Sequence, residues 1–480
     1  MDFFRGTPDH YGNRRSRISV RSKQGLLVAG SITFVILAAI LAIKPTPILR
    51  NNATEQDPFA AASAASAVSS APPQTGLSSQ ISELEDGASS KQVTTTTFPH
   101  TVHEVANVDQ WNAAVAAAEP GDVIRLVANI GSILQYRGFL AEADRGVGNG
   151  GTPERPITIT ANPDVWIDPG DTSNRKPALD LLHTQHVNVD GVNVRNSQFG
   201  IRVSQSNGTA ESPLTITNST VTNIGHSGIV VAGHLKTRSP SRHVRVEANT
   251  VSNTGQTASE FGEGVYIGYG ATEWADQTSD VTVIGNEITQ TTAEGIDVKP
   301  GTRNIRIQDN TIHDLSPISG GAISAHYVGN QANPDPDTPG NLVISGNRIW
   351  NVNLDGTPGS NDWAIWVGHG GVTITDNIIW GLRDTSKTRA IRIRALHDFG
   401  PHPIVITGNT FWTATGWVAE GSPDPRNSVQ ASGNKGPSSA GGVESSISPS
   451  GAPAIGSGGD ADNGQGPGSA LGYTPPDPNS

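Results

Sequence analysis

Acidic and basic residues meet in the middle of the chain, where short strands would present them on one face. Glu263 and Glu294 each stand just before a Gly-apolar-x-apolar segment, and Asp297 and Lys299 lie two residues apart within the second of these segments. Residues two apart on a strand point to the same side. Clustered carboxylates supply the oxygen ligands that Ca²⁺ prefers, and a lysine that is desolvated or lies beside a cation has a lowered pKa. We therefore expect Glu263, Glu294 and Asp297 to bind Ca²⁺ and Lys299 to be a catalytic base.

Further side chains expected on this face suit a long anionic sugar chain. Arg392 and Arg394 would hold carboxylates, and Tyr266 and Trp366 would offer aromatic faces to sugar rings. His326 is a second candidate catalytic residue. These are the groups that β-elimination requires, because the uronate carboxylate must be neutralised, the C5 proton removed and the O4 leaving group expelled. The predicted partner is an acidic polysaccharide.

The same residues also have purely structural interpretations. The two glutamates would close turns, Asp297 and Lys299 would form a surface ion pair of small value, and His326 would be an ordinary exposed histidine. Trp366 would pack beneath a long loop. His369 and His397 lie near the same face, but histidines without tight spacing are a weak signal for zinc.

A repeat along the chain places these residues. An apolar-x-apolar-x-x-Asn-x-apolar phrase recurs at intervals of 24 to 37 residues, which is typical of a solenoid whose loops differ in size. A β-propeller is excluded, because its blades need roughly 40 residues and four strands each. Stacked asparagines tolerate the left-handed backbone of tight corners and form hydrogen bonds along the column. The phrase aligns these residues: Asn162, Val192, Ser219, Asn249, Asn286, Asn310, Asn347, Asn377 and Asn409.

A second strand in each repeat carries the candidate site. Its apolar members form an interior stack, and the residues between them face outward. The aligned interior residues are Ile201, Ile229, Val265, Ile296, Ile323, Ile365 and Ile391. One outward column then contains Arg202, Val230, Tyr266, Asp297, Ser324, Trp366 and Arg392. Parallel strands stacked at about 4.8 Å predict an all-β fold, a single-stranded right-handed parallel β-helix.

Composition agrees with this fold and limits the partners. The 480 residues include 55 glycines and no cysteine, which suits a turn-rich β protein without disulfides or thiolate metal sites. A formal net charge of −12 argues against nucleic acid as the main partner. We expect a monomer.

The segments flanking the repeats suggest a membrane-tethered domain. Residues 1–24 form a basic tail, and the uncharged run 25–43 is long enough for a transmembrane signal-anchor helix, for which roughly 20 residues are needed. The basic side stays cytoplasmic, so the β-helix would lie outside, in the periplasm or the extracellular space. A cleaved signal peptide is the alternative. Residues 44–97 are predicted to form a disordered tether, and residues 436–480 are predicted to form a disordered tail.

The β-helix domain is expected over 98–435. A short amphipathic helix over 108–118 would cap its first coil, where strand edges would otherwise be exposed.

Several motifs resemble the pectate-lyase-like right-handed parallel β-helix superfamily. They are the phrase at Glu119–Leu126, GTPERPITI at Gly151–Ile159, and GEGVYIG at Gly262–Gly268 followed by TTAEGIDVKPGT at Thr291–Thr302, which resemble secreted bacterial β-helix repeat proteins. The resemblance implies a polysaccharide lyase with Lys299 as base; the alternative is a non-catalytic β-helix that binds or organises envelope polysaccharide. Pro169 and Gly170 follow the VWID motif where pectate lyases continue with histidine, and the absence of an Asp-Asp pair disfavours a polygalacturonase-type hydrolase.

Overall fold

The computed structural model describes residues 100–137, 150–234, 236–257, 261–270, 276–317, 321–325, 340–352, 363–382, 389–395, 402–412, 416–421, 429–437 and 443–445. Many of its strands show the alternating burial that their sequences predict. In strand β16 (Ser279–Ile284), Val281 and Val283 are fully buried, whereas Thr282 between them is half-buried. Successive side chains of a strand point to opposite faces, so this alternation gives such a strand one face in the core and one face outside. Other strands, such as β9 (Phe199–Ser204) and β18 (Ile296–Val298), are buried at every position.

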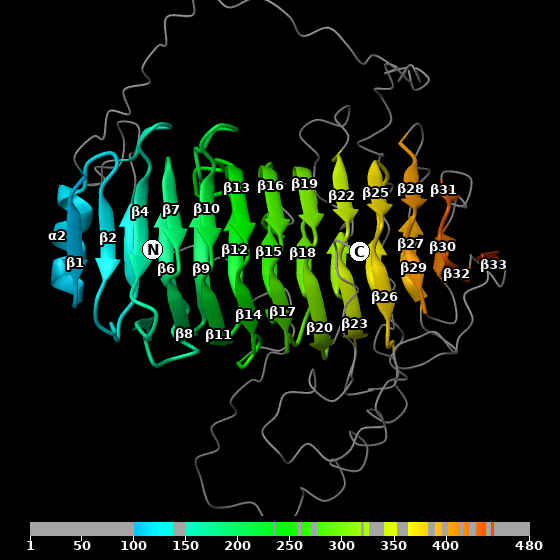
Figure 1. Cartoon of the computed structure of the whole chain (residues 1–480), viewed down its shortest axis with the longest axis horizontal. Helices are drawn as coiled ribbons and strands as arrows, with labels where there is room; N and C mark the ends of the chain where they lie inside the picture. Colours follow the sequence, from blue (N-terminus) through cyan, green and yellow to red (C-terminus); the bar gives the residue numbers. More distant parts are fainter. Residues whose placement is uncertain are drawn as a thin grey trace, which may run out of the picture.

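Three parallel sheets run along the domain, and the chain passes from one sheet to the next as it coils (Figure 1). Sheet A contains, in order, β1 (Val102–Val105), β2 (Val123–Leu126), β4 (Ile157–Ala161), β7 (Val187–Asp190), β10 (Leu214–Thr217), β13 (Arg242–Glu247), β16, β19 (Arg303–Gln308), β22 (Leu342–Ser345), β25 (Val372–Thr375), β28 (Ile404–Thr407) and β31 (Val429–Ser432). Sheet B contains β5 (Trp166–Ile167), β8 (Asn193–Ser197), β11 (Thr220–Ile224), β14 (Thr250–Ser252), β17 (Glu287–Thr289), β20 (Thr311–Leu315), β23 (Arg348–Val352), β26 (Ile378–Trp380) and β29 (Thr410–Phe411). Sheet C contains β3 (Leu134–Arg137), β6 (Pro177–Leu182), β9 (Phe199–Ser204), β12 (Ile229–Ala232), β15 (Val265–Ile267), β18 (Ile296–Val298), β21 (Ile323–Ala325), β24 (Trp363–Val367), β27 (Arg389–Ala395) and β30 (Trp417–Gly421).

Parallel pairing between strands that are one coil apart confirms the predicted β-helix. In sheet C, for example, Val265 pairs with Ile296, and Ile296 pairs with Ile323. All three of these side chains are fully buried and belong to one continuous apolar core filled from the three sheets. The interior stack predicted from the sequence is therefore present.

A buried asparagine column closes the corner between sheets A and B. The Asn286 Oδ1 atom accepts hydrogen bonds from the backbone N–H and the side-chain amide of Asn249, both at 2.9 Å, and Asn286 Nδ2 donates to Asn310 Oδ1 at 2.9 Å. The pattern of one side chain bonding to the next continues through Ser219, Asn249, Asn286, Asn310, Asn347, Asn377, Asn409 and Asn434. The predicted column is confirmed from Ser219 to Asn409 and extends one coil further.

Glycines precede the central strands of sheet C because the neighbouring coil and core side chains lie too close for a Cβ atom there. A Cβ atom on Gly264 would lie 2.5 Å from Ile288 Cγ2 and 2.6 Å from the carbonyl oxygen of Gly295. A Cβ atom on Gly295 would lie 2.7 Å from the carbonyl oxygen of Ala322. These contacts explain why each acidic residue just before a central strand is followed by glycine.

Helix α2 (Val108–Ala117) lies beside β1 at the N-terminal end of the domain (Figure 1). Asn107 begins the helix, because its side chain accepts a hydrogen bond from the backbone N–H of Gln110 at 3.0 Å. The buried face includes Trp111, whose indole N–H donates to the carbonyl oxygen of Gln135 at 2.8 Å. The helix thus occupies the residues at which the sequence predicts one.

The predicted tail, membrane segment and tether (1–24, 25–43 and 44–97) lie outside the described residues. Among the residues that are described, no helix is long and apolar enough to cross a membrane. Strands β32 (Gly436–Pro437) and β33 (Val443–Ser445) form an antiparallel pair within the range 436–480, which the sequence predicts as a disordered tail.

Candidate active site on sheet C

The outward face of sheet C carries the column that the sequence predicts. Strand register pairs Arg202 with Val230, Val230 with Tyr266, and Tyr266 with Asp297. The same register continues from Asp297 through Ser324, Trp366 and Arg392. The predicted alignment of this column is confirmed, so Tyr266 and Asp297 are direct neighbours on adjacent coils.

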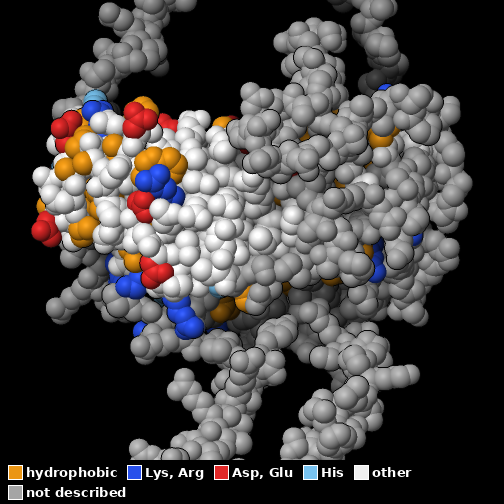
Figure 2. All heavy atoms as spheres, turned by 90° about the horizontal axis from the view of Figure 1, so that it is seen from below, with side chains coloured by type: hydrophobic (Ala, Val, Ile, Leu, Met, Phe, Trp, Pro, Cys, Tyr) orange, Lys and Arg blue, Asp and Glu red, His pale blue; other side chains and the backbone are white. Residues whose placement is uncertain are grey.

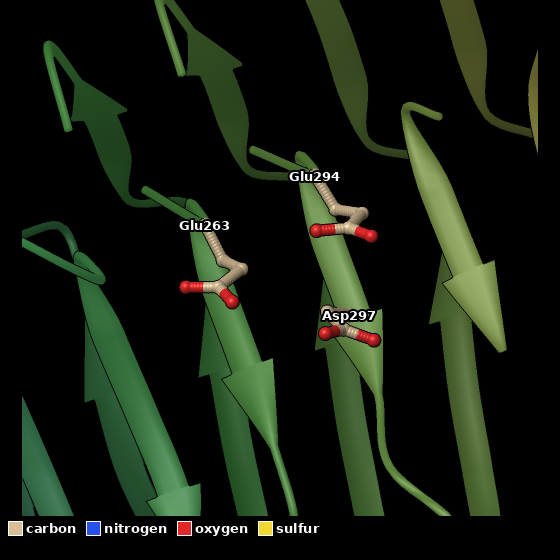
Figure 3. Close-up of side chains that lie close together, drawn as sticks. All are labelled: Glu263, Glu294 and Asp297. Atoms are coloured by element: carbon tan, nitrogen blue, oxygen red, sulfur yellow. The ribbon is translucent and has the colours of Figure 1, made fainter. Parts of the chain in front are cut away.

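Three carboxylates converge at the centre of this face. Glu263 precedes β15, Glu294 precedes β18, and Asp297 lies within β18; Figure 3 shows their carboxylates on the same side of the sheet. One oxygen from each residue lies within 4.8 Å of the others. The exposed fractions are 3% for Glu263, 6% for Glu294 and 1% for Asp297. The three acids that the sequence proposes as metal ligands therefore form one buried group.

Backbone pairing explains why two glutamates from different coils are adjacent. The N–H of Gly264 donates to the carbonyl oxygen of Glu294 at 3.0 Å, which fixes Glu263 and Glu294 one coil apart in the same column. Ser227 occupies the preceding coil, and its hydroxyl donates to Glu263 Oε2 at 2.7 Å. This contact was not predicted from the sequence, although Ser227 stands just before Gly228 as Glu263 stands just before Gly264.

Lys299 completes the group. Its Nζ atom forms an ion pair with Asp297 Oδ2 and lies 4.8 Å from the centre of the Tyr266 ring. The side chain of Lys299 is 15% exposed, so the interpretation of this pair as a surface ion pair is wrong. The Tyr266 hydroxyl accepts a hydrogen bond from the backbone N–H of Gly270 at 3.1 Å. Five side chains from two coils thus share one small volume.

Burial and mutual repulsion shift the protonation of the acids. Burial raises the pKa of Glu263, and the charge of Asp297 raises it further, against the opposing effect of Lys299. Burial likewise raises the pKa of Glu294 well above its ordinary value, with further contributions from Asp297 and Glu263. Without a cation, the two glutamates therefore favour their neutral form more than exposed glutamates do.

The pKa of Lys299 shifts in the direction opposite to the one expected from sequence. Burial alone would lower it, but the charges of Asp297, Tyr266, Glu263 and Glu294 together raise the pKa of Lys299 well above its ordinary value. The expectation of a lowered pKa assumed desolvation or a neighbouring cation, and here the charges of the three nearby acids outweigh desolvation. Lys299 is accordingly an ammonium group at neutral pH in this arrangement.

The chemistry of the group fits a divalent cation. Three ionised carboxylates and one ammonium carry a formal charge of −2, which one divalent cation would cancel. Asp297 Oδ1 is buried and has no hydrogen-bond partner in the described part of the chain. Ca²⁺ binds oxygen ligands at 2.3–2.6 Å, so carboxylate oxygens within 4.8 Å of one another can share it. Glu263, Glu294 and Asp297 would hold such an ion.

Aromatic and basic side chains lie further along the same column. Trp366 and Arg392 stand two and three strands beyond Asp297, about 10 and 15 Å along the axis. The Arg392 guanidinium lies 4.0 Å from the centre of the Trp363 ring, a partner that the sequence analysis missed. His326 lies outside the described residues, and the side chain of Arg394, which stands on β27, is also outside them.

The N-terminal part of the column contains a buried ion pair instead of a cluster of carboxylates. Arg202 donates to both carboxylate oxygens of Asp180, at 2.9 and 2.7 Å, and Gln135 Nε2 donates to Asp180 Oδ2 at 3.2 Å. This ion pair is buried, and the apolar side chain of Val230 separates it from Tyr266. The sequence alignment included Arg202 but missed Asp180, because no glycine precedes its strand.

On the side that Figure 2 shows, the charged side chains of the described residues do not all have the same sign. Acidic and basic side chains lie next to one another toward the N-terminal end, beside a broad area of uncharged side chains and backbone. Binding of an anionic polymer would therefore depend on particular side chains and not on a generally basic surface, in agreement with the net charge of −12.

Comparison with known proteins bears on the fold. The family model described as "Right handed beta helix region" matches residues 177–379. No curated protein sequence matches the chain. An alginate lyase from Paenibacillus sp. str. FPU-7 is similar in structure, with 17% identity, a TM-score of 0.49, and coverage of 71% of this chain and 99% of that chain. The tailspike protein of E. coli bacteriophage HK620, solved with a pentasaccharide, has 12% identity, a TM-score of 0.43, and coverage of 69% and 54%.

A PL6-family alginate lyase has 14% identity and a TM-score of 0.43, with coverage of 69% of this chain and 40% of that chain. The matched family region spans β6 to β26, and each of the three sheets in that region is built from parallel strands one coil apart. The described part of the chain therefore has the right-handed parallel β-helix fold that its sequence predicts, and residues 177–379 match the family model of that fold.

Proposed function

We propose that this chain is a carbohydrate-active β-helix protein that binds an acidic polysaccharide along sheet C and cleaves it by β-elimination at the central coils. One observation carries the proposal: the buried carboxylates of Glu263, Glu294 and Asp297 lie together with the half-buried side chains of Lys299 and Tyr266 on two adjacent coils. A purely structural ion pair would not require two further carboxylates with raised pKa values beside it. Perturbed acids clustered around a lysine are typical of catalytic sites.

The roles follow from position. A Ca²⁺ ion held by Glu263, Glu294 and Asp297 would neutralise the uronate carboxylate and stabilise the charge that develops when the C5 proton leaves. Lys299 Nζ would accept that proton, the C–H electron pair would form the C4–C5 double bond, and O4 would leave with its bonding electrons and take a proton from water. Trp366 and Arg392 would bind sugar units further along the column.

The raised pKa of Lys299 makes this mechanism conditional on the cation. Asp297 and the two glutamates stabilise the ammonium form of Lys299, and that form cannot accept a proton. Charge compensation of these carboxylates by a divalent cation would lower the pKa of Lys299 and free it from Asp297. We therefore expect strict dependence of turnover on a divalent cation.

The raised pKa of Lys299 also favours the second candidate function, a β-helix that binds acidic polysaccharide without cleaving it. A permanently protonated Lys299 would serve as a carboxylate ligand and not as a base. In that case the lysine should contribute to affinity, whereas the lyase proposal assigns it to turnover.

The experiment that separates them mixes the purified protein with pectate, alginate and glycosaminoglycan polymers, with Ca²⁺ or with a chelator. Elimination is detected as ultraviolet absorbance of the conjugated double bond, and binding as retardation of the protein in polymer-containing gels. Lys299→Ala should abolish product formation and leave polymer binding nearly unchanged, while the exposed Lys176→Ala should match wild type. Asp297→Asn should reduce both the rate and its Ca²⁺ dependence. Polymer binding without any unsaturated product would refute the lyase proposal in favour of the second function.

We also propose that the segment 25–43 anchors the protein in a membrane, with the basic tail 1–24 in the cytoplasm and the β-helix outside. Its support is the uncharged apolar run that follows the basic residues. Protease added to intact cells should then remove the β-helix domain and leave an epitope tag at the N-terminus intact. A released domain that begins just after Ile43 would instead show signal-peptide cleavage.

A further inference from the structure

A polar pocket of about 400 Å³ lies on the outer face of sheet A, on a different sheet from the acidic group. Its floor is formed by Arg245, Thr282 and Arg306, which stand in register on the adjacent strands β13, β16 and β19. Residues of the loop 209–213, which precedes β10, line one side. With Asn341, which precedes β22, the pocket is built from five consecutive coils of the solenoid.

The two arginines of the floor differ in their partners. Arg245 donates to both carboxylate oxygens of Glu247, at 2.6 and 3.0 Å, so its charge is compensated and its guanidinium is held in place. Arg306 is exposed, and it forms no ion pair or hydrogen bond with the residues that the structure describes. The floor thus offers one uncompensated positive charge next to an oriented second guanidinium with donors to spare.

The rim is a chain of hydrogen-bonded corner residues. Asn341 Nδ2 donates to Asn304 Oδ1 at 3.1 Å, and Asn304 Nδ2 donates to Asp280 Oδ1 at 2.9 Å. Asp280 Oδ2 accepts from the Ser279 hydroxyl at 2.7 Å, so both of its carboxylate oxygens have donors. These contacts hold the polar side chains of the rim in position.

We propose that this pocket is a second carbohydrate-binding site that takes a carboxylate-bearing sugar unit. Arg306 supplies the positive charge for one carboxylate, and the Asp280 carboxylate on the rim, whose donors are the neutral Ser279 and Asn304, disfavours the two charges of a phosphate monoester. Threonine and asparagine side chains match sugar hydroxyls, and the described lining contains no tryptophan, tyrosine or phenylalanine that would select an apolar ligand. The choice of a sugar rests on the proposed function, whereas anion binding at Arg306 does not.

A second site on another sheet would change how the protein holds a polymer. A chain bound at both sheet A and sheet C would stay attached when either contact opens, because rebinding occurs at high effective concentration. Loss of the sheet A pocket should therefore weaken binding of long polymers more than cleavage of short ones.

The test is calorimetric titration of the full-length protein, in a Lys299→Ala background so that no ligand is consumed. The probes are trigalacturonate, trimannuronate and, as a neutral control, cellotriose. Arg306→Ala should lower the affinity of one class of sites for at least one uronate trimer by about tenfold or more, the loss of one hydrogen bond to a charged group. Arg306→Gln should behave alike, which guards against a folding defect in one variant. Arg125→Ala, on the same face of sheet A at β2, should bind as the parent does.

The outcomes separate this proposal from the proposed function. If Arg306→Ala and Arg125→Ala bind every trimer alike, or if cellotriose binds the pocket as well as the uronates do, the pocket proposal is overturned. If unsaturated products never form from any polymer but Arg306-dependent binding persists, the lyase function fails and the pocket stands. If Arg306 governs the binding of inorganic sulfate while no uronate binds at all, the carbohydrate assignment of the pocket is overturned.

Discussion

Replacing Asn286 by leucine should show how strongly the asparagine column stabilises the β-helix. Asn286 is 1% exposed, and its Oδ1 atom accepts from both the backbone N–H and Nδ2 of Asn249. Its Nδ2 atom donates to the carbonyl oxygens of Val246 and Ile284 and to Asn310 Oδ1. Leucine has a similar volume but neither donor nor acceptor, so the change removes hydrogen bonds without opening a large cavity.

The magnitude follows from which groups lose all their partners. Asn249 Nδ2 keeps its bond to the Ile216 carbonyl oxygen, and Asn310 Oδ1 keeps its bond from the Asn286 backbone N–H. The backbone N–H of Asn249 is left unpaired in a buried corner, which costs about 1–3 kcal/mol. The carbonyl oxygens of Val246 and Ile284 also lose the hydrogen bonds from Asn286 Nδ2. We therefore expect a loss of about 2–4 kcal/mol in the free energy of unfolding.

The assay is urea denaturation followed by circular dichroism, with the loss read from the transition midpoint at unchanged slope. Asn286→Ser should lose less, because Ser219 occupies the equivalent position two coils earlier and its hydroxyl still accepts from the Val192 N–H at 3.2 Å. Gln308→Leu, half-buried on the outer face of sheet A, is the matched control and should change stability little. If the leucine and serine variants at position 286 unfold together with the Gln308 variant, the column does not stabilise the fold in the way argued.

Three further predictions concern buried charges. Asp180→Asn should destabilise by about 3–5 kcal/mol because it leaves Arg202 buried without its counter-charge, whereas Asp180→Leu combined with Arg202→Met should recover much of the loss in a double-mutant cycle. Burial raises the pKa of Asp276 to about 6, against hydrogen bonds from Gly233 and Thr278 that lower it, so the stability from this residue should fall as pH rises from 3.8 toward 6. Urea titrations at several pH values should show that Asp276→Asn removes this part of the pH dependence; an unchanged profile would contradict the assignment. Ca²⁺ should raise the melting temperature of wild type, by an amount worth about 2.7 kcal/mol at a hundredfold excess over Kd, and should have much less effect on Glu294→Gln; equal shifts in the two proteins would argue against a cation at these carboxylates.

The parts of the fold that local periodicity determines could be predicted from the sequence. A side-chain period of two assigns Ile296 to the interior and Asp297 to the outer face without any knowledge of the neighbouring coil. The recurring asparagine then sets the register, because a one-residue slip would move the buried side chains to the outer face. For this reason the alignment placed Tyr266 beside Asp297 before any contact was known, as strand pairing now shows.

The site was less predictable, since burial and charge depend on everything that surrounds a strand. The sequence shows which side chains face outward from sheet C, but not that the outward Asp297 is 1% exposed. The direction of the Lys299 pKa shift depends on the summed charge of acids on two coils, and their combined effect cannot be found from one strand alone. The Asp180–Arg202 ion pair was not predicted for another reason. The strand Pro177–Leu182 has no glycine to align it with the other strands, so its register is known only from the strand pairing in the structure.

Charge compensation along one column explains why the central coils, and not the first ones, are the candidate active site. Asp180 and Arg202 occupy the same outward position as Tyr266 and Asp297, and they form a bidentate pair whose formal charges cancel. That pair is complete without any ligand. At the central coils, Lys299 compensates one carboxylate of three, and a formal charge of −2 remains in a buried volume. An uncompensated buried charge is costly unless protonation or a bound cation removes it, so this part of sheet C has a reason to bind a cation that the N-terminal part lacks.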